Sequence, residues 1–76
     1  MARLDIKRFK QSSPKIQRVH DLVSGEYSII ADRDNKLLQI DTFGRDSRQI
    51  EGKVSQSIQL DKATIEAIIK IYNTKF

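Results

Sequence analysis

The sequence predicts an α+β fold, a small twisted antiparallel sheet of about four strands covered by one C-terminal helix. In three stretches between residues 27 and 60 apolar residues recur at every second position, and after residue 61 they recur at every third or fourth. The chain has 76 residues, a length that allows one domain with a marginal core. We expect residues 15–76 to form that domain, with the strands within residues 19–60, behind a flexible basic arm at residues 1–14.

The N-terminal segment carries the excess positive charge of the chain. Residues 1–20 contain six cations and the single anion Asp5, whereas residues 21–76 have a net charge of −1, so this segment accounts for the formal charge of +4. Leu4, Ile6 and Phe9 stand among charges before the run Gln-Ser-Ser-Pro, which is typical of a mobile arm. A polyphosphate chain is the expected partner, and a solubilising tail is the alternative.

The segment from residue 13 to residue 25 has two interpretations. Ser13 as N-cap, Pro14 at the first helical position and Gly25 as C-cap describe a short helix. Residues 19–23 can instead extend the first strand backwards through a bend at Gly25. Of the two, the strand is favoured.

An antiparallel hairpin is expected next. Tyr27, Ile29 and Ala31 alternate with the intervening residues, and the same period of two continues through residues 37–42. The polar run at residues 32–36 contains Asn and Asp, which tolerate positive φ in a turn.

The remaining elements are a last strand and a capped helix. After Gly44 and a polar connection, Val54, Ile58 and Leu60 alternate with polar residues, as in an antiparallel sheet with one wet face. Asp61 is a good N-cap for a helix over residues 62–75. Its apolar stripe, at i, i+3, i+4, i+7 and i+11, consists of Ile65, Ile68, Ile69, Tyr72 and Phe76.

The order of hairpin, polar loop, Gly-Lys turn, short strand and capped helix resembles the transcriptional positive-cofactor-four family of single-stranded-DNA-binding proteins. The resemblance covers residues 27–72, and its motif is GKVSQSIQLD at residues 52–61. It implies single-stranded-DNA binding in transcription regulation and a homodimer in which the helices of two subunits pair. The chain departs from the family at Thr64 and Ile65, where a large aromatic is usual, and in its shorter loop after the second strand.

Cations and flat side chains suited to a single-stranded polynucleotide occur along the sheet as well. Arg45, Arg48 and Lys53 surround the polar loop, and Tyr27 and Phe43 are the candidate stacking rings. In the alternative interpretation, both rings belong to the core and the loop arginines pair with Asp46 and Glu51. The expected nucleic-acid-binding residues are Arg3, Lys7, Arg8, Lys10, Lys15, Arg18, Tyr27, Arg33, Lys36, Phe43, Arg45, Arg48 and Lys53.

A symmetric homodimer is expected because the core of so short a chain is marginal. Ile68, Ile71 and Tyr72 on the helix are the expected interface residues. Ile71 lies off the apolar stripe, so it is either a subunit contact or the edge of the core face.

Two other classes of function stay open. The first is a protein–protein interaction module that regulates or inhibits a nucleic-acid enzyme. The second is a metal-dependent nuclease, because Asp41 followed by Glu51-Gly52-Lys53 matches a permissive Asp…Glu-x-Lys signature. Gly52 and the short chain argue against the nuclease, so we expect a non-catalytic protein.

Composition excludes several kinds of site. The chain has no cysteine, which excludes disulfides and thiolate metal sites, and His20 is its only histidine. Neither a signal peptide nor a membrane span is evident, so a cytoplasmic protein without cofactor or metal is expected.

Overall fold

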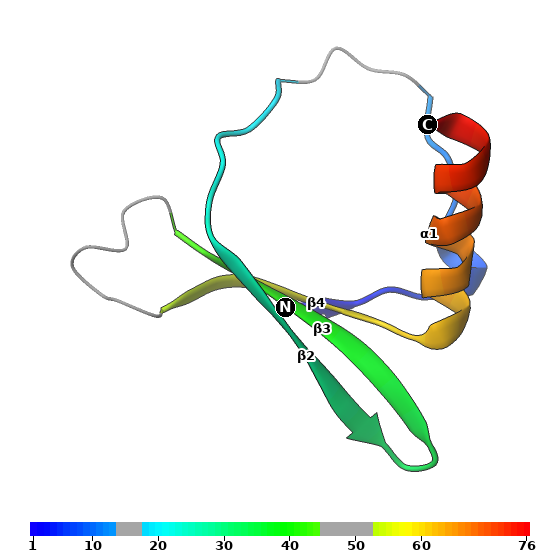
Figure 1. Cartoon of the computed structure of the whole chain (residues 1–76), viewed down its shortest axis with the longest axis horizontal. Helices are drawn as coiled ribbons and strands as arrows, with labels where there is room; N and C mark the ends of the chain where they lie inside the picture. Colours follow the sequence, from blue (N-terminus) through cyan, green and yellow to red (C-terminus); the bar gives the residue numbers. More distant parts are fainter. Residues whose placement is uncertain (14–17, 45–52) are drawn as a thin grey trace.

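The computed structural model describes residues 1–13, 18–44 and 53–76. Its strands form a single sheet in the order β1-β4-β3-β2, and one helix follows the last strand (Figure 1). The α+β class, with a small four-stranded sheet and one C-terminal helix, is therefore confirmed. The elements are β1 (Ala2–Arg3), the 3-10 helix η1 (Ile6–Arg8), β2 (Gly25–Asp32), β3 (Asn35–Phe43), β4 (Val54–Leu60) and α1 (Lys62–Lys75).

The expected hairpin is formed by β2 and β3, which pair from Gly25 opposite Thr42 to Asp32 opposite Asn35. Its turn is tighter than the polar run suggested, because pairing at Asp32 and Asn35 leaves two residues for it. The positive φ falls on Arg33, at 57°, and not on an Asn or Asp. Two-residue hairpin turns need positive φ at their first central position, so the strand register decides which residue adopts it.

One face of the sheet is largely apolar, and the other is polar except near the hairpin turn. In the register of β3 with its neighbours, apolar residues lie opposite apolar ones and Gln39 lies opposite Gln59. Residues directly opposite each other share a face. We call one set the apolar face: Tyr27, Ile29, Leu38, Ile40, Ile58 and Leu60. The opposite face, which we call the polar face, carries Ser28, Gln39, Asp41, Ser57 and Gln59, and near the hairpin turn it also carries Ile30 and the buried Leu37.

The sheet is mixed and not antiparallel throughout, because its fourth strand comes from the N-terminal segment. β1 pairs in parallel with β4, with Ala2 opposite Ile58 and Arg3 opposite Gln59. The amide of Leu4 extends the pairing by donating to the carbonyl of Gln59 at 3.0 Å. Residues 2–4 thus cover the outer edge of β4, which would otherwise leave its backbone groups unpaired.

The strand expected at residues 19–23 is not formed, and this prediction was wrong. Residues 18–24 belong to no strand or helix, and residues 14–17, on which the helical interpretation depends, lie outside the described residues. Val19 and Leu22 are fully exposed. The pairing of β2 with β3 begins at Gly25, so residues 19–23 have no neighbouring strand to bury them.

Helix α1 begins at Lys62, directly after Asp61, as the predicted N-cap indicated. The carboxylate of Asp61 accepts a hydrogen bond from the amide of Thr64 at 2.8 Å, and the Thr64 side chain is buried. The Thr64 side chain and the Thr64 amide together lower the pKa of the Asp61 carboxyl below its ordinary value of 3.8. The Thr64 hydroxyl lies outside hydrogen-bond geometry, so the amide contact is the well-formed one.

Replacing Asp61 with alanine is expected to lower the midpoint of thermal unfolding by about 4–8 °C at pH 7, because an N-cap acceptor is lost. A carboxyl with a lowered folded pKa stabilises the fold above its unfolded pKa, here 3.8, and loses this contribution as the pH falls through the folded value. The difference in unfolding midpoint between the native chain and Asp61→Ala should therefore become smaller below pH 3.8, as measured by circular dichroism. Asp61→Asn, which keeps an acceptor without the charge, is the control. A difference that stays constant down to pH 2 would contradict the assignment.

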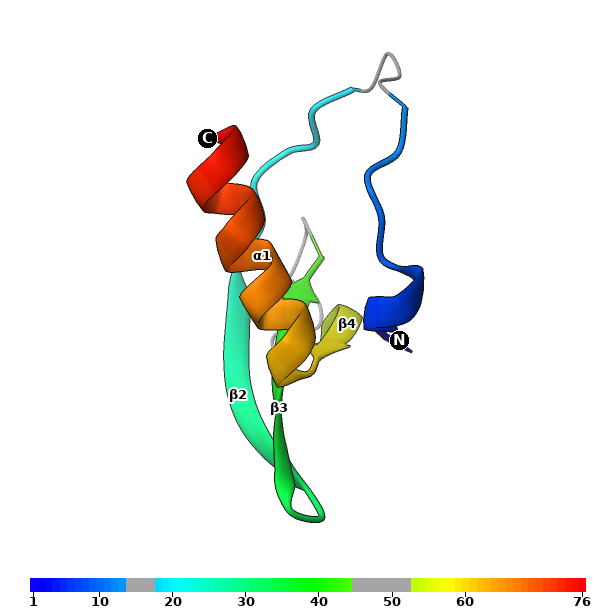
Figure 2. The ribbon, with the colours of Figure 1, turned by 90° about the vertical axis from the view of Figure 1, so that its right-hand side faces the viewer.

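The core of the single chain is small. Leu37 and Leu60 are the buried apolar residues among those described. Helix α1 leaves the sheet at the end of β4, and most of its turns lie clear of the strands (Figure 1). Figure 2 shows α1 running away from the turn that joins β2 to β3. The apolar stripe of α1 is consequently not buried by its own chain.

Candidate nucleic-acid interface

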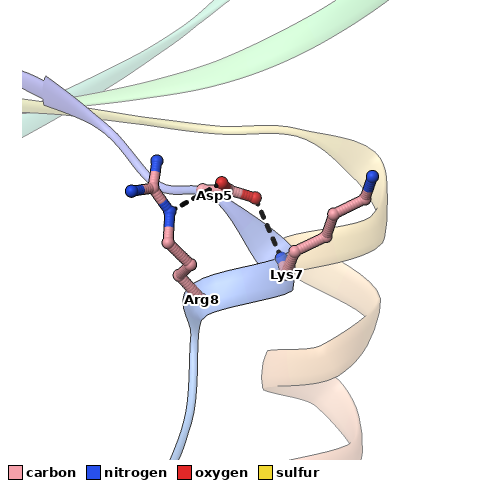
Figure 3. Close-up of polar contacts among 3 residues, drawn as sticks. All are labelled: Asp5, Lys7 and Arg8. Atoms are coloured by element: carbon pink, nitrogen blue, oxygen red, sulfur yellow. Dashed lines mark hydrogen bonds and ion pairs between the residues drawn. The ribbon is translucent and has the colours of Figure 1, made fainter.

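The 3-10 helix η1 organises two of the expected cations around one carboxylate (Figure 3). Oδ1 of Asp5 accepts a hydrogen bond from the amide nitrogen of Lys7 at 2.9 Å. Oδ2 of Asp5 forms an ion pair with Nε of Arg8 at 3.0 Å. These contacts, the Lys7 amide first, lower the pKa of the Asp5 carboxyl below its usual 3.8. Figure 3 shows the Lys7 ammonium directed away from Asp5, so Asp5 offsets the charge of Arg8 and leaves that of Lys7.

Arg3 is paired as well. Its guanidinium lies 3.4 Å from the carboxylate of Asp32, which connects the edge strands β1 and β2. Both side chains are about half exposed, so the pair contributes little to stability. Arg3 can therefore exchange Asp32 for another anion at low cost.

The other described cations of the expected site have no ion pair with any described residue, and all of them are exposed. Three belong to the N-terminal segment, two to the hairpin and one to the start of β4. Exposed cations without ion pairs in these three segments leave a positive potential that an external anion can neutralise. They are Lys7, Lys10, Arg18, Arg33, Lys36 and Lys53.

Three expected cations, Lys15, Arg45 and Arg48, lie outside the described residues. Of the cations predicted around the polar loop, Lys53 is the one that the structure describes.

The two candidate stacking rings have different surroundings. Tyr27 lies on edge strand β2 opposite Ile40 and is 76% exposed, so it is no core residue of the single chain. Phe43 is half-buried at the end of β3, where a register shift separates it from Thr42. Of the two rings, that of Tyr27 is accessible for stacking with another aromatic group.

The polar face carries a hydrogen-bonded ladder that was not predicted as a site. The carboxylate of Asp41 accepts from the amide of Gln39 at 3.1 Å and from the hydroxyl of Ser57 at 2.5 Å, while Gln59 donates to Gln39 at 2.9 Å. The period of two could have indicated these residues, because Gln39 and Asp41 share one phase of β3. Amide and hydroxyl groups of this kind can bond the edges of unpaired bases.

Asp41 is also the first residue of the nuclease signature. It lies on the polar face of β3 within the ladder, and Lys53 precedes β4, but Glu51 lies outside the described residues. No group of three or more metal-ligating side chains occurs in the described part of the chain.

No helix among residues 1–13, 18–44 and 53–76 has the length and apolar character needed to cross a bilayer. Comparison with known protein families, curated proteins and solved structures found no match to this chain. The resemblance to the positive-cofactor-four family thus stays a prediction.

Proposed function

We propose that the protein binds single-stranded nucleic acid, preferably DNA and with little sequence preference, as a non-catalytic cytoplasmic protein that acts as a dimer. The observation that carries the proposal is the set of exposed cations without ion pairs: Lys7, Lys10, Arg18, Arg33, Lys36 and Lys53.

Electrostatics supports a polyanion as the ligand. The described residues offer few carboxylates to the N-terminal cations, and Asp5 is already held by Arg8 and the Lys7 amide. A chain of phosphates can meet several separated cations at once and release counterions at each contact, which a small anion cannot do.

A single strand is favoured over a duplex because its bases are accessible. The exposed ring of Tyr27 can stack on a base, and one stacked base contributes about 1–3 kcal/mol. The ladder of Gln39, Ser57 and Gln59 on the polar face offers amide and hydroxyl groups to base edges. Both features suit a ligand whose bases are not paired.

The second candidate is a protein–protein interaction module. The exposed apolar residues of α1 and the sheet favour it, because large apolar patches usually mark contacts with protein. The two candidates differ in the salt dependence of binding.

Fluorescence polarisation with a labelled 20-nucleotide single-stranded DNA, the matching duplex and a single-stranded RNA tests the proposal. With about four phosphates neutralised, raising the salt from 50 to 200 mM should weaken single-strand binding about 50-fold. The duplex should bind more weakly at both salt concentrations. Absence of binding to all three oligonucleotides at 50 mM salt would overturn the proposal.

A further inference from the structure

We propose that a second copy of this chain covers the apolar stripe of α1, with the helix of each copy seated on the apolar sheet face of the other. This inference does not rest on nucleic-acid binding. It rests on two apolar surfaces of the same chain that its own fold leaves open.

The first surface is the stripe of α1 after its first turn. Ile69 is 53% exposed, Tyr72 65% and Phe76 92%, although the three share one side of the helix with Ile65 and Ile68. The rings of Tyr72 and Phe76 stack on each other, with their centroids 6.0 Å apart, and so form a flat apolar end. A stripe of this width is normally the buried side of a helix.

The second surface is the apolar face of the sheet. Ile29 on edge strand β2 is 58% exposed, and Leu38, Ile40 and Ile58 are only partly buried. The register places these four side chains on the same face of three neighbouring strands. Together they form a surface broad enough to receive a helix.

Within its own chain the helix meets this face at its first turns and then leaves it. Asp61 alone separates β4 from α1, and its carboxylate fixes the first turn. Ile65 still lines a shared hollow with Ile29 and Leu38, so the stripe meets its own sheet there. The 14 residues of α1 then extend about 21 Å away from that contact.

The chain exposes more surface than a compact protein of its mass. The whole chain exposes 7446 Å², whereas a compact protein of its 8.8 kDa exposes about 4,800 Å². Its radius of gyration is 14.7 Å, against about 11 Å for a compact chain of this length. A standard interface takes about 800 Å² from each partner, and the excess here exceeds that severalfold.

A second copy is the occupant that fits both surfaces at once. Each chain presents an apolar ridge and an apolar surface, so a two-fold axis can satisfy both pairs of surfaces with one type of contact. A different partner would have to supply both complements. The polar face lies outside this contact, because the two faces of a sheet point in opposite directions. Tyr27 lies on the apolar face of edge strand β2, so its ring can meet a base in the dimer only at the rim of the contact.

The inferred interface differs from the one expected from the helix alone. Ile68 and Tyr72 belong to the stripe and therefore remain in the inferred interface. Ile71 lines a hollow together with Ala67, Phe9 and Lys10 of its own chain. The N-terminal segment thus occupies the side of α1 on which Ile71 lies.

Cross-linking between two single-cysteine variants tests the proposal, because the chain has no cysteine of its own. Ile29→Cys and Ile69→Cys are mixed, unfolded, refolded together and treated with a short bis-maleimide linker. A product joining one chain of each variant is expected. The control pair, Ser28→Cys with Ile69→Cys, places the first thiol on the polar face and should give less than a tenth of that product.

Two results would overturn the inference. The first is cross-linking of Ile69→Cys to itself with no mixed Ile29–Ile69 product, since the helices would then pair with each other and not with the sheets. The second is a mass of 8.8 kDa for the unmodified chain by light scattering at about 100 µM, since a dimer needed for folding should persist at that concentration. The light-scattering result decides the question even where a cysteine variant does not fold.

Discussion

Replacing Lys7, Lys10 and Arg18 together with glutamine is expected to weaken the binding of single-stranded DNA about a hundredfold at 0.1 M salt. Each lost phosphate contact removes about 0.7 from the slope of log affinity against log salt, and three contacts remove about 2.1. At 0.1 M this slope corresponds to about two powers of ten in affinity. The measurement is a polarisation titration at four salt concentrations.

A matched control is available on α1. Lys62, Lys70 and Lys75 are also exposed, and replacing them with glutamine changes the net charge by the same amount. This control variant should lose less affinity than the N-terminal triple variant, because its three lysines lie outside the proposed contact set, although Lys70 and Lys75 share a hollow with Lys10. Equal losses in both triple variants would show that net charge alone determines binding, which contradicts an interface at the N-terminal segment.

The unfolding midpoint of the native chain is expected to depend on protein concentration. Leu37 and Leu60, the buried apolar residues within the described ranges, stabilise a single chain too little to offset the entropy of ordering it. The folded chain should therefore exist mainly as a dimer, and tenfold dilution should lower the midpoint by about 4 °C. Thermal scans by circular dichroism from 2 to 200 µM would measure this.

One substitution in the stripe should have the largest effect on stability. Ile69→Asp places a charge in the proposed contact and is expected to abolish both the dimer and most of the helical signal at micromolar concentration. Thr74→Asp adds the same carboxylate at an exposed position on the side of the helix opposite the stripe, and it should leave the dimer intact. A folded, monomeric Ile69→Asp protein would contradict the view that association is needed for folding.

The candidate site was only partly accessible to sequence reasoning. Charge counting identifies the N-terminal cations, and the spacing of Asp5 and Arg8 is compatible with a local pair. The pairing of Arg3 with Asp32 joins residues 29 positions apart. It depends on β1 lying in the same sheet as β2, and nothing in the local pattern indicates that placement.

Local patterns were sufficient for the hairpin, the last strand and the helix. The period of two fixes which residues of β2, β3 and β4 share a face, since consecutive side chains of a strand point to opposite sides. Asp61 fixes the start of α1, since a carboxylate there satisfies a free amide of the first turn. Both signals act within a few residues and need no knowledge of the rest of the chain.

Tertiary structure alone decided two features of this protein. One is the parallel pairing of β1 with β4, which recruits the basic segment into the sheet because the edge of β4 needs backbone partners. The other is the exposure of the α1 stripe. The apolar spacing predicts that the stripe is buried, but it does not indicate which surface covers it. A hydrophobic pattern shows which side of a helix has to be buried. Only the path of the chain determines whether the sheet of the same chain can bury it.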